Sequence, residues 1–135
     1  MKKDIPQYKV EEVAIAIIPR PQSEEDEILW DTYILNLREE PIKSVLISSR
    51  GYGEIKGEKM KTTMLRHFFE EIGSNSFAMI EPIQSKLFNL TNEYWISFSL
   101  GEYMFDKKYV FVKGSIDPAN FTNIPLLNQK GVMIK

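Results

Sequence analysis

The stretch that decides the fold is Glu93-Tyr94-Trp95-Ile96-Ser97-Phe98-Ser99-Leu100. Every second residue from Tyr94 to Leu100 is large and apolar, and the residues between them are Trp95 and two serines. A period of two is typical of a β-strand that buries one face. Gly101-Glu102 then predicts a hairpin turn into a partner strand around residues 109–112.

Similar apolar runs elsewhere are bounded by proline, glycine or acidic residues, which predicts further short strands. They are residues 10–18, 28–37, 42–49 and 77–80. Because no regular alternation of strands and helices appears, a parallel α/β sheet is not expected. We therefore expect one mainly β domain over residues 1–135, an antiparallel sandwich of the immunoglobulin or fibronectin type III kind.

The segment 63–72 fits two structures. Thr63 could cap a short helix whose apolar residues recur at helical spacing up to Gly73. As a strand, the same segment would place Leu65, His67 and Phe69 on one side. The strand is favoured because the segments on both sides are strands, and the short helix stays the alternative.

The apolar face of the segment 28–37 carries one acidic residue. Leu29, Tyr33 and Leu35 share this face and Asp31 interrupts it, whereas Trp30 lies on the other face and is expected to be the central core residue. A carboxylate there either belongs to a functional site or, more commonly, lies at a strand edge or accepts hydrogen bonds from backbone amides. His67 is the only histidine, so an enzyme built on Asp31 and His67 is the least supported function.

The composition limits the possible functions. The chain has 135 residues, a net charge of −2 and no cysteine, which excludes disulfides and thiolate metal sites. Near-balanced charge argues against general nucleic-acid binding. The longest apolar run, residues 13–18, is too short to cross a bilayer, and we expect a cytoplasmic protein outside the membrane. No catalytic residue, metal site or cofactor is predicted.

Two groups of residues are candidates for binding. Aromatic residues on the clearest strand, Tyr94 and Trp95, could contact a protein partner or a second copy of the chain. The best-supported function is therefore a non-enzymatic interaction or self-association module. The alternative is nucleic-acid or phosphate-ligand binding by a glycine-rich basic loop, with the candidate residues Arg50, Tyr52, Lys56, Lys59 and Lys61. A hairpin with a solvated lysine edge is the more ordinary interpretation of that loop.

Four short motifs lie between Trp30 and Gly131, namely residues 48–53, 65–67, 92–95 and 106–109. With these motifs the chain resembles a group of small uncharacterised bacterial proteins of the Bacteroidetes type. Some of them are labelled as a phenylalanyl-tRNA synthetase subunit. That label would imply a large catalytic sheet and a glycine-rich, arginine-ending ATP motif, and the sequence contains neither. The resemblance therefore implies no activity and no site residues.

Overall fold

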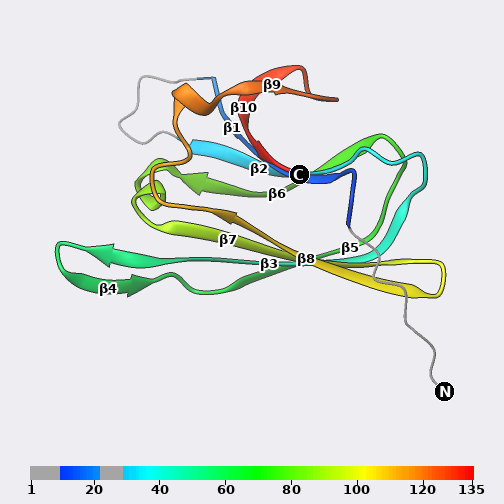
Figure 1. Ribbon diagram of the computed structural model, residues 1–135, viewed down its shortest axis with the longest axis horizontal. Coiled ribbons are helices and arrows are strands. Elements are labelled where there is room, and N and C mark those ends of the chain that lie inside the picture. Colours follow the sequence, from blue (N-terminus) through cyan, green and yellow to red (C-terminus); the bar gives the residue numbers. More distant parts are fainter. Residues whose placement is uncertain (1–9, 22–28) are drawn as a thin grey trace.

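The computed structural model describes residues 10–21 and 29–135, and within them ten strands form two antiparallel sheets. The first sheet has the order β6-β2-β1-β10-β9, and the second has the order β4-β3-β7-β8 with β5 also paired to β3. The two sheets face each other as two layers (Figure 1). Their bounds are β1 Val13–Pro19, β2 Leu29–Asn36, β3 Ile42–Ile55, β4 Glu58–Lys61, β5 Leu65–Ile72, β6 Ser76–Gln84, β7 Thr91–Leu100, β8 Tyr103–Phe111, β9 Thr122–Ile124 and β10 Gln129–Ile134.

The molecule is the mainly β, antiparallel sandwich that the sequence predicts. Its strand pairing also agrees with part of the immunoglobulin order, because β6-β2-β1 and β3-β7-β8 pair as strands E-B-A and C-F-G do in that fold. Two additions depart from the constant-type pattern. Here β10 and β9 extend the first sheet, and β5 and β4 extend the second. The immunoglobulin or fibronectin type III kind stays a prediction.

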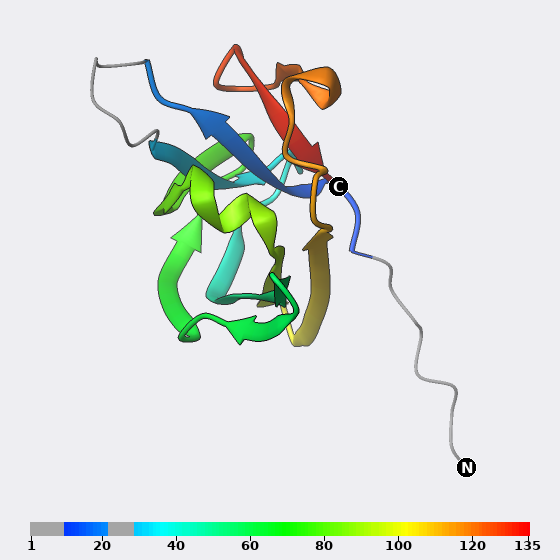
Figure 2. The same cartoon turned by 90° about the vertical axis from the view of Figure 1, so that its left-hand side faces the viewer.

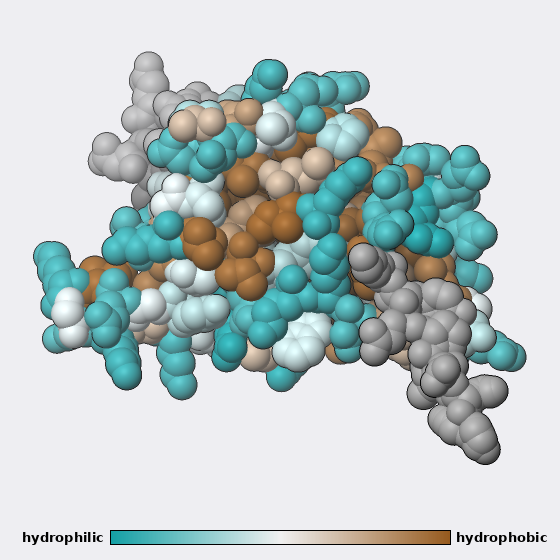
Figure 3. All heavy atoms as spheres, viewed as in Figure 1, coloured by the Kyte–Doolittle hydropathy of each residue, from teal (hydrophilic) through white to brown (hydrophobic). Residues whose placement is uncertain are grey.

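The alternation that predicts β7 also decides how β7 packs. Tyr94, Ile96 and Phe98 are buried in the core between the sheets, whereas Trp95 is 49% exposed on the outer face. Burying three large side chains of one strand contributes several kcal/mol, at roughly 2 kcal/mol each. Figure 3 shows apolar atoms in a band across the middle of one side of the molecule, between the two layers.

Trp30 belongs to the same core, as expected, and lies where two short 3₁₀ helices close the sandwich. The helices are η1 (Ser85–Asn89) and η2 (Pro118–Asn120), and Figure 2 shows η1 crossing this end of the two sheets. The Trp30 ring meets Phe88 and Phe121 edge-on, at centroid distances of 5.0 and 5.7 Å. Edge-on aromatic contacts of this kind stabilise by about 1 kcal/mol beyond the area they bury.

The segment 65–72 is the strand β5, which confirms the favoured prediction and excludes the helix. It pairs with β3 from Ile42↔Ile72 to Ser49↔Leu65. The helical spacing misleads because Leu65 and Phe68, which contribute to it, are exposed side chains of an edge strand. After Ile72 the chain passes from the second sheet to β6 of the first sheet, so the edge strands β5 and β6 lie on the same side of the sandwich.

The face of β2 that Asp31 interrupts points away from the core between the sheets. Trp30 and Ile34 face the core between the sheets, and Leu35 lies in a second cluster on the outer side of the first sheet. Ile124 and the partly buried Leu127 belong to that cluster. Both faces of β2 are covered, and this is why the strand carries apolar residues on both faces. Ile28, the first residue of the predicted strand, lies outside the described residues.

The predicted glycine-rich loop is also different, because residues 50–55 continue the strand β3. Lys56 and Gly57 alone form the turn into β4, with φ of 53° and 80°. Two consecutive positive φ values define the tight hairpin turn that fits the twist of two antiparallel strands.

Within the described residues, the only helical segments are too short and polar to cross a membrane.

Candidate functional site

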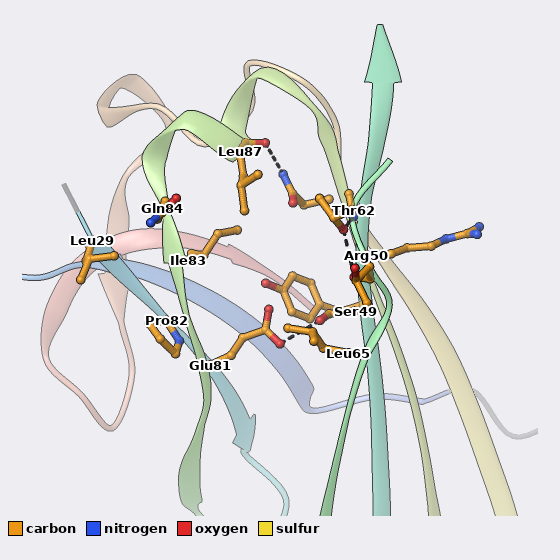
Figure 4. Close-up of a pocket in the computed structure, with 14 residues that line it drawn as sticks. Leu29, Ser49, Arg50, Thr62, Leu65, Glu81, Pro82, Ile83, Gln84 and Leu87 are labelled. Carbon is orange, nitrogen blue, oxygen red and sulfur yellow. Dashed lines mark hydrogen bonds between the residues drawn. The ribbon is translucent and has the colours of Figure 1, made fainter. Parts of the chain in front are cut away.

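A cleft of about 400 Å³ lies between the two sheets, on the side where the edge strands β5 and β6 lie. Its walls come from β6 of the first sheet and β3 of the second, and η1 contributes Leu87 at one end (Figure 4). Its described lining is mostly apolar and includes Leu29, Leu65, Ile83 and Tyr94. The size and the apolar character are those of pockets that bind small molecules.

The cleft opens where β3 changes its partner along one edge. β5 pairs with β3 as far as Ser49, and β4 pairs with it from Tyr52 onward. Between them, Gly51 holds the connecting chain, because its N–H donates to Thr62 Oγ1 and its carbonyl accepts from the Thr62 N–H, both at 2.8 Å. A Cβ on Gly51 would lie 3.0 Å from Asn92 Oδ1, so this crossing requires a glycine or a shift of Asn92.

Glu81 enters the cleft because the pairing of β2 with β6 is irregular. The register shifts between Thr32 and Tyr33, which pair with Glu81 and Met79 respectively, so Ile80 is an extra residue. Such a β-bulge reverses the alternation of the faces, and Ile80 and Glu81 both turn toward the interior. The Thr32 hydroxyl fixes this geometry, since it donates to Glu81 O at 2.9 Å and accepts from Glu81 N at 3.2 Å.

The Glu81 carboxylate is the centre of a polar cluster at the cleft wall. Ser49 Oγ donates to Glu81 Oε1 at 2.8 Å, and His67 Nε2 lies 2.7 Å from the same oxygen. Burial, and then the nearby charge of Glu81, raise the pKa of Tyr94, which is buried against this cluster. Figure 4 shows Glu81 reaching from β6 toward Ser49 on β3, so the carboxylate joins the two sheets.

This arrangement differs from a serine-protease type of triad. In a triad the histidine lies between the hydroxyl and the carboxylate, so that it can take the proton of the hydroxyl. Here Ser49 and His67 both bond to Glu81, and the carboxylate lies between them. Ser49 is therefore held as a hydrogen-bond donor to the acid. The geometry suits an anionic anchor for a ligand better than an activated nucleophile.

A second charged cluster lies on the outer face of the second sheet. Glu93, whose side chain is 6% exposed, accepts from Arg50 Nε at 2.6 Å and lies 3.1 Å from Lys108 Nζ. Burial alone would raise the pKa of Glu93, but the hydrogen bonds and charges of Arg50 and Lys108 outweigh burial and lower it. The two cations also cover aromatic rings, Arg50 over Tyr52 at 5.3 Å and Lys108 over Trp95 at 5.0 Å.

Large apolar side chains lie exposed beside this cluster. Phe68 of β5 pairs with Leu46 of β3, and these side chains are 60% and 41% exposed. Trp95 of β7 pairs with Ser48, the next outward residue of β3 after Leu46. These neighbouring positions make Phe68, Leu46 and Trp95 one apolar patch, which we call the outer patch.

The structure separates the two aromatic residues predicted to bind a partner. Trp95 lies in the outer patch, but Tyr94 is buried in the core and lines the cleft. The prediction that Tyr94 contacts a partner at the surface is therefore wrong, because successive side chains of a strand point to opposite faces.

The five basic-loop candidates are dispersed along the hairpin β3–β4. Arg50, Tyr52 and Lys61 line one cavity of about 580 Å³ together with residues 62–64. Lys59 lines a neighbouring cavity of about 450 Å³ with Tyr52 and Lys61. Lys56 occupies the turn itself. The hairpin brings three of the five together, and Arg50 is already paired with Glu93.

Asp31 and His67 have different partners. Asp31 forms an ion pair with Arg20 at 2.8 Å on the outer side of the first sheet, and His67 bonds to Glu81 between the sheets. The two residues therefore do not form the acid–base pair of the least supported hypothesis. Among residues 10–21 and 29–135, no group of three acidic or histidine side chains is placed to bind a metal ion.

Comparisons of the chain with known protein families, with curated proteins and with solved structures found no match.

Proposed function

We propose that this chain is a protein-interaction module that self-associates through the outer patch. The observation that carries this proposal is the exposure of Phe68, Leu46 and Trp95 at neighbouring positions of one sheet. Exposed apolar side chains are ordinary when they are scattered, but a contiguous group is characteristic of interaction surfaces. Tryptophan is also among the residues that contribute most to binding energy at protein interfaces.

The two sheets of the sandwich differ in how their outer faces are covered. On the first sheet, Ile124 and Leu127 belong to a cluster with the outward residues Ala14, Ala16 and Ile18. Within the described part of the chain, no such segment covers the outward residues of β3 and β7. A second molecule on this face would bury apolar surface that the chain itself leaves in water. Each Å² of apolar surface buried stabilises the complex by about 25 cal/mol.

The charges around the outer patch favour a second copy as the partner. Arg66 pairs with Ser48, Lys108 pairs with Trp95, and Asp106 pairs with Ser97, so both signs border the patch. In a two-fold symmetric dimer each side chain meets the partner's copy of the same face. A border with both signs allows Asp106 of one subunit to approach a cation of the other.

Sedimentation velocity over a range of concentrations tests this proposal. We expect the unmodified protein to dimerise, and Trp95→Ala to weaken dimerisation by about tenfold or more. Met79→Ala is the matched control, because Met79 is 42% exposed on the outer side of the first sheet. Circular dichroism establishes that both variants are folded. A monomer at every concentration, or equal dimerisation of Trp95→Ala and the unmodified protein, would contradict the proposal.

A second candidate function is the binding of a phosphate-bearing ligand by the hairpin β3–β4. It is favoured by the cavity that Arg50, Tyr52 and Lys61 share. Calorimetric titration with tripolyphosphate tests it, and the expected affinity falls at higher salt and in Lys61→Met. Lys86→Met changes an exposed lysine of η1 and is the control. Equal affinities for Lys61→Met and Lys86→Met would exclude the hairpin as the site.

A further inference from the structure

We infer that the cleft between the sheets binds a small organic ammonium ion, with Glu81 as the anion that receives the ammonium group. The ligand class is a primary or secondary amine on a compact apolar body. This inference is independent of the proposed self-association, because the cleft lies on the inner side of β3 and the outer patch lies on its outer side.

The size and lining of the cleft select a small and mainly apolar ligand. Its volume of about 400 Å³ is at the lower end of the range for small-molecule pockets. Leu65, Ile83 and Leu87 supply aliphatic surface, and the Tyr94 ring adds aromatic surface. Figure 4 shows Ile83 and Leu87 on the same side of the opening as Glu81, so one ligand could contact the apolar wall and the carboxylate together.

The charge of the cleft selects a cation. Of the described residues that line it, only Glu81 and Arg50 carry a formal charge. Arg50 does not neutralise Glu81, because its guanidinium bonds to Glu93 on the outer face and points away from the cleft in Figure 4. The neutral Ser49 hydroxyl contributes a dipole, and His67 contributes a positive charge only when it is protonated. An ammonium ion would compensate the carboxylate in this mostly apolar surrounding, whereas an anion would be repelled.

The carboxylate still has room for a ligand. An ionised carboxylate can accept about four hydrogen bonds. Ser49 and His67 use Oε1, and Tyr94 also interacts with the Glu81 side chain. These three contacts hold the carboxylate in one orientation before the ligand arrives, and the bulge at Ile80 holds its backbone. An anchor that is fixed in advance loses little entropy when a ligand binds.

The test compares three probes of similar shape, which are phenethylamine, phenethyl alcohol and phenylacetate. Each probe is titrated into the full chain and followed by amide chemical shifts in two-dimensional NMR. We expect phenethylamine to bind at least about tenfold more tightly than the alcohol, since the ammonium group adds the attraction of opposite charges to a hydrogen bond that the neutral hydroxyl could also make. Phenylacetate should bind most weakly. The shifted amides should lie around Ser49, Glu81 and Leu87.

Two variants separate the roles of charge and space. Glu81→Gln should remove the preference for the amine, so that the amine and the alcohol bind alike. Leu65→Trp should weaken both by about tenfold by filling the mouth of the cleft, and it should fold, because Leu65 is 47% exposed. Met104→Trp makes a matched change at an exposed position of β8 that belongs neither to the cleft nor to the outer patch, and it should bind like the unmodified protein.

Three results would overturn the inference. They are equal affinities of the amine and the alcohol in the unmodified protein, shifts confined to the outer patch, and no saturable binding of any probe. A Glu81→Gln protein that keeps the amine preference would also overturn it. If Glu81→Gln does not fold, the ratio of amine to alcohol affinity and the pair Leu65→Trp and Met104→Trp still decide the question.

Discussion

Gly131→Ala should destabilise the protein strongly, because β10 passes too close to β1 for a side chain. A Cβ at Gly131 would lie 2.6 Å from the carbonyl oxygen of Ile17 and 2.9 Å from Ile18 Cγ1. The backbone oxygen cannot rotate away as a flexible side chain could. The neighbouring pair, Ile17↔Val132, belongs to the ladder between β1 and β10, so relief of the clash requires the two strands to separate locally.

The magnitude follows from these contacts. An overpacked methyl group in an interior costs about 1–3 kcal/mol, and each weakened ladder hydrogen bond adds about 1 kcal/mol. We therefore expect Gly131→Ala to lose about 3 kcal/mol of unfolding free energy. For a domain of this size, about 1 kcal/mol corresponds to 3–4 °C, so the melting temperature should fall by about 10 °C.

Two other glycines provide controls for the same measurement, which is thermal unfolding by circular dichroism. Gly73→Ala should be nearly neutral, because the nearest atom to its Cβ is the flexible Ser76 Oγ at 3.4 Å. Gly101→Ala meets no atom within 4 Å but has a φ of +60°, so it should cost about 1 kcal/mol through backbone strain alone. Equal melting temperatures for Gly131→Ala and Gly73→Ala would refute the steric argument.

Three further predictions concern buried polar groups. Glu93→Gln should cost about 1–2 kcal/mol in urea unfolding at neutral pH. Because the pKa of Glu93 is lowered in the folded protein, this difference should be lost as the pH falls from about 4.5 through the folded pKa. A difference that persists in acid would contradict the charge argument. Tyr109→Phe should cost about 1–2 kcal/mol in the same assay, because the hydroxyl donates to Val13 O at 2.6 Å, and an unchanged urea midpoint would show that this bond adds nothing. Burial raises the pKa of Tyr94 and of Tyr109. Their contribution to the free energy of unfolding should therefore be fully present below about pH 10, and it should be lost as the pH rises above that value. Tyrosinate absorbance from these two residues should therefore appear only together with loss of the circular dichroism signal, and its earlier appearance would mean that they are accessible while folded.

The sequence alone was enough to predict the fold class, because most strands bury one face against the same core. Phe98 and Ile96 of β7 are buried as the alternation predicts. The method fails where a strand lacks a single buried face. β2 is apolar on both faces because each is covered, and the exposed Leu65 and Phe68 of the edge strand β5 imitate a helical period.

The cleft could not be predicted, because its key residue lies in an irregularity that involves a proline. Pro82 is an ordinary signal for the end of a strand, and the sequence alone therefore ends this strand at Ile80. In the structure β6 continues to Gln84. β6 is an edge strand, so Pro82 can lie where no ladder hydrogen bond is required. The pairing of Glu81 with Thr32 and the bond from Ser49 show that the carboxylate faces the interior.

The two irregularities of the sandwich meet at one place, and this is the strongest reason to regard the cleft as a binding site. β3 has 14 residues and needs two partners along one edge, which leaves the interruption between β5 and β4. Across the sandwich, the bulge at Ile80 turns Glu81 toward that same interruption, where Ser49 binds it. An interruption alone would be a packing defect that larger side chains could fill, and a bulge alone would leave a charge in the core. Here the bulge places the Glu81 carboxylate opposite Ser49 at the interruption, so the opening has a fixed carboxylate at its wall. A protein that needed only stability would gain from an apolar residue in place of Glu81, since well-packed apolar groups are often at least as stabilising as buried charges.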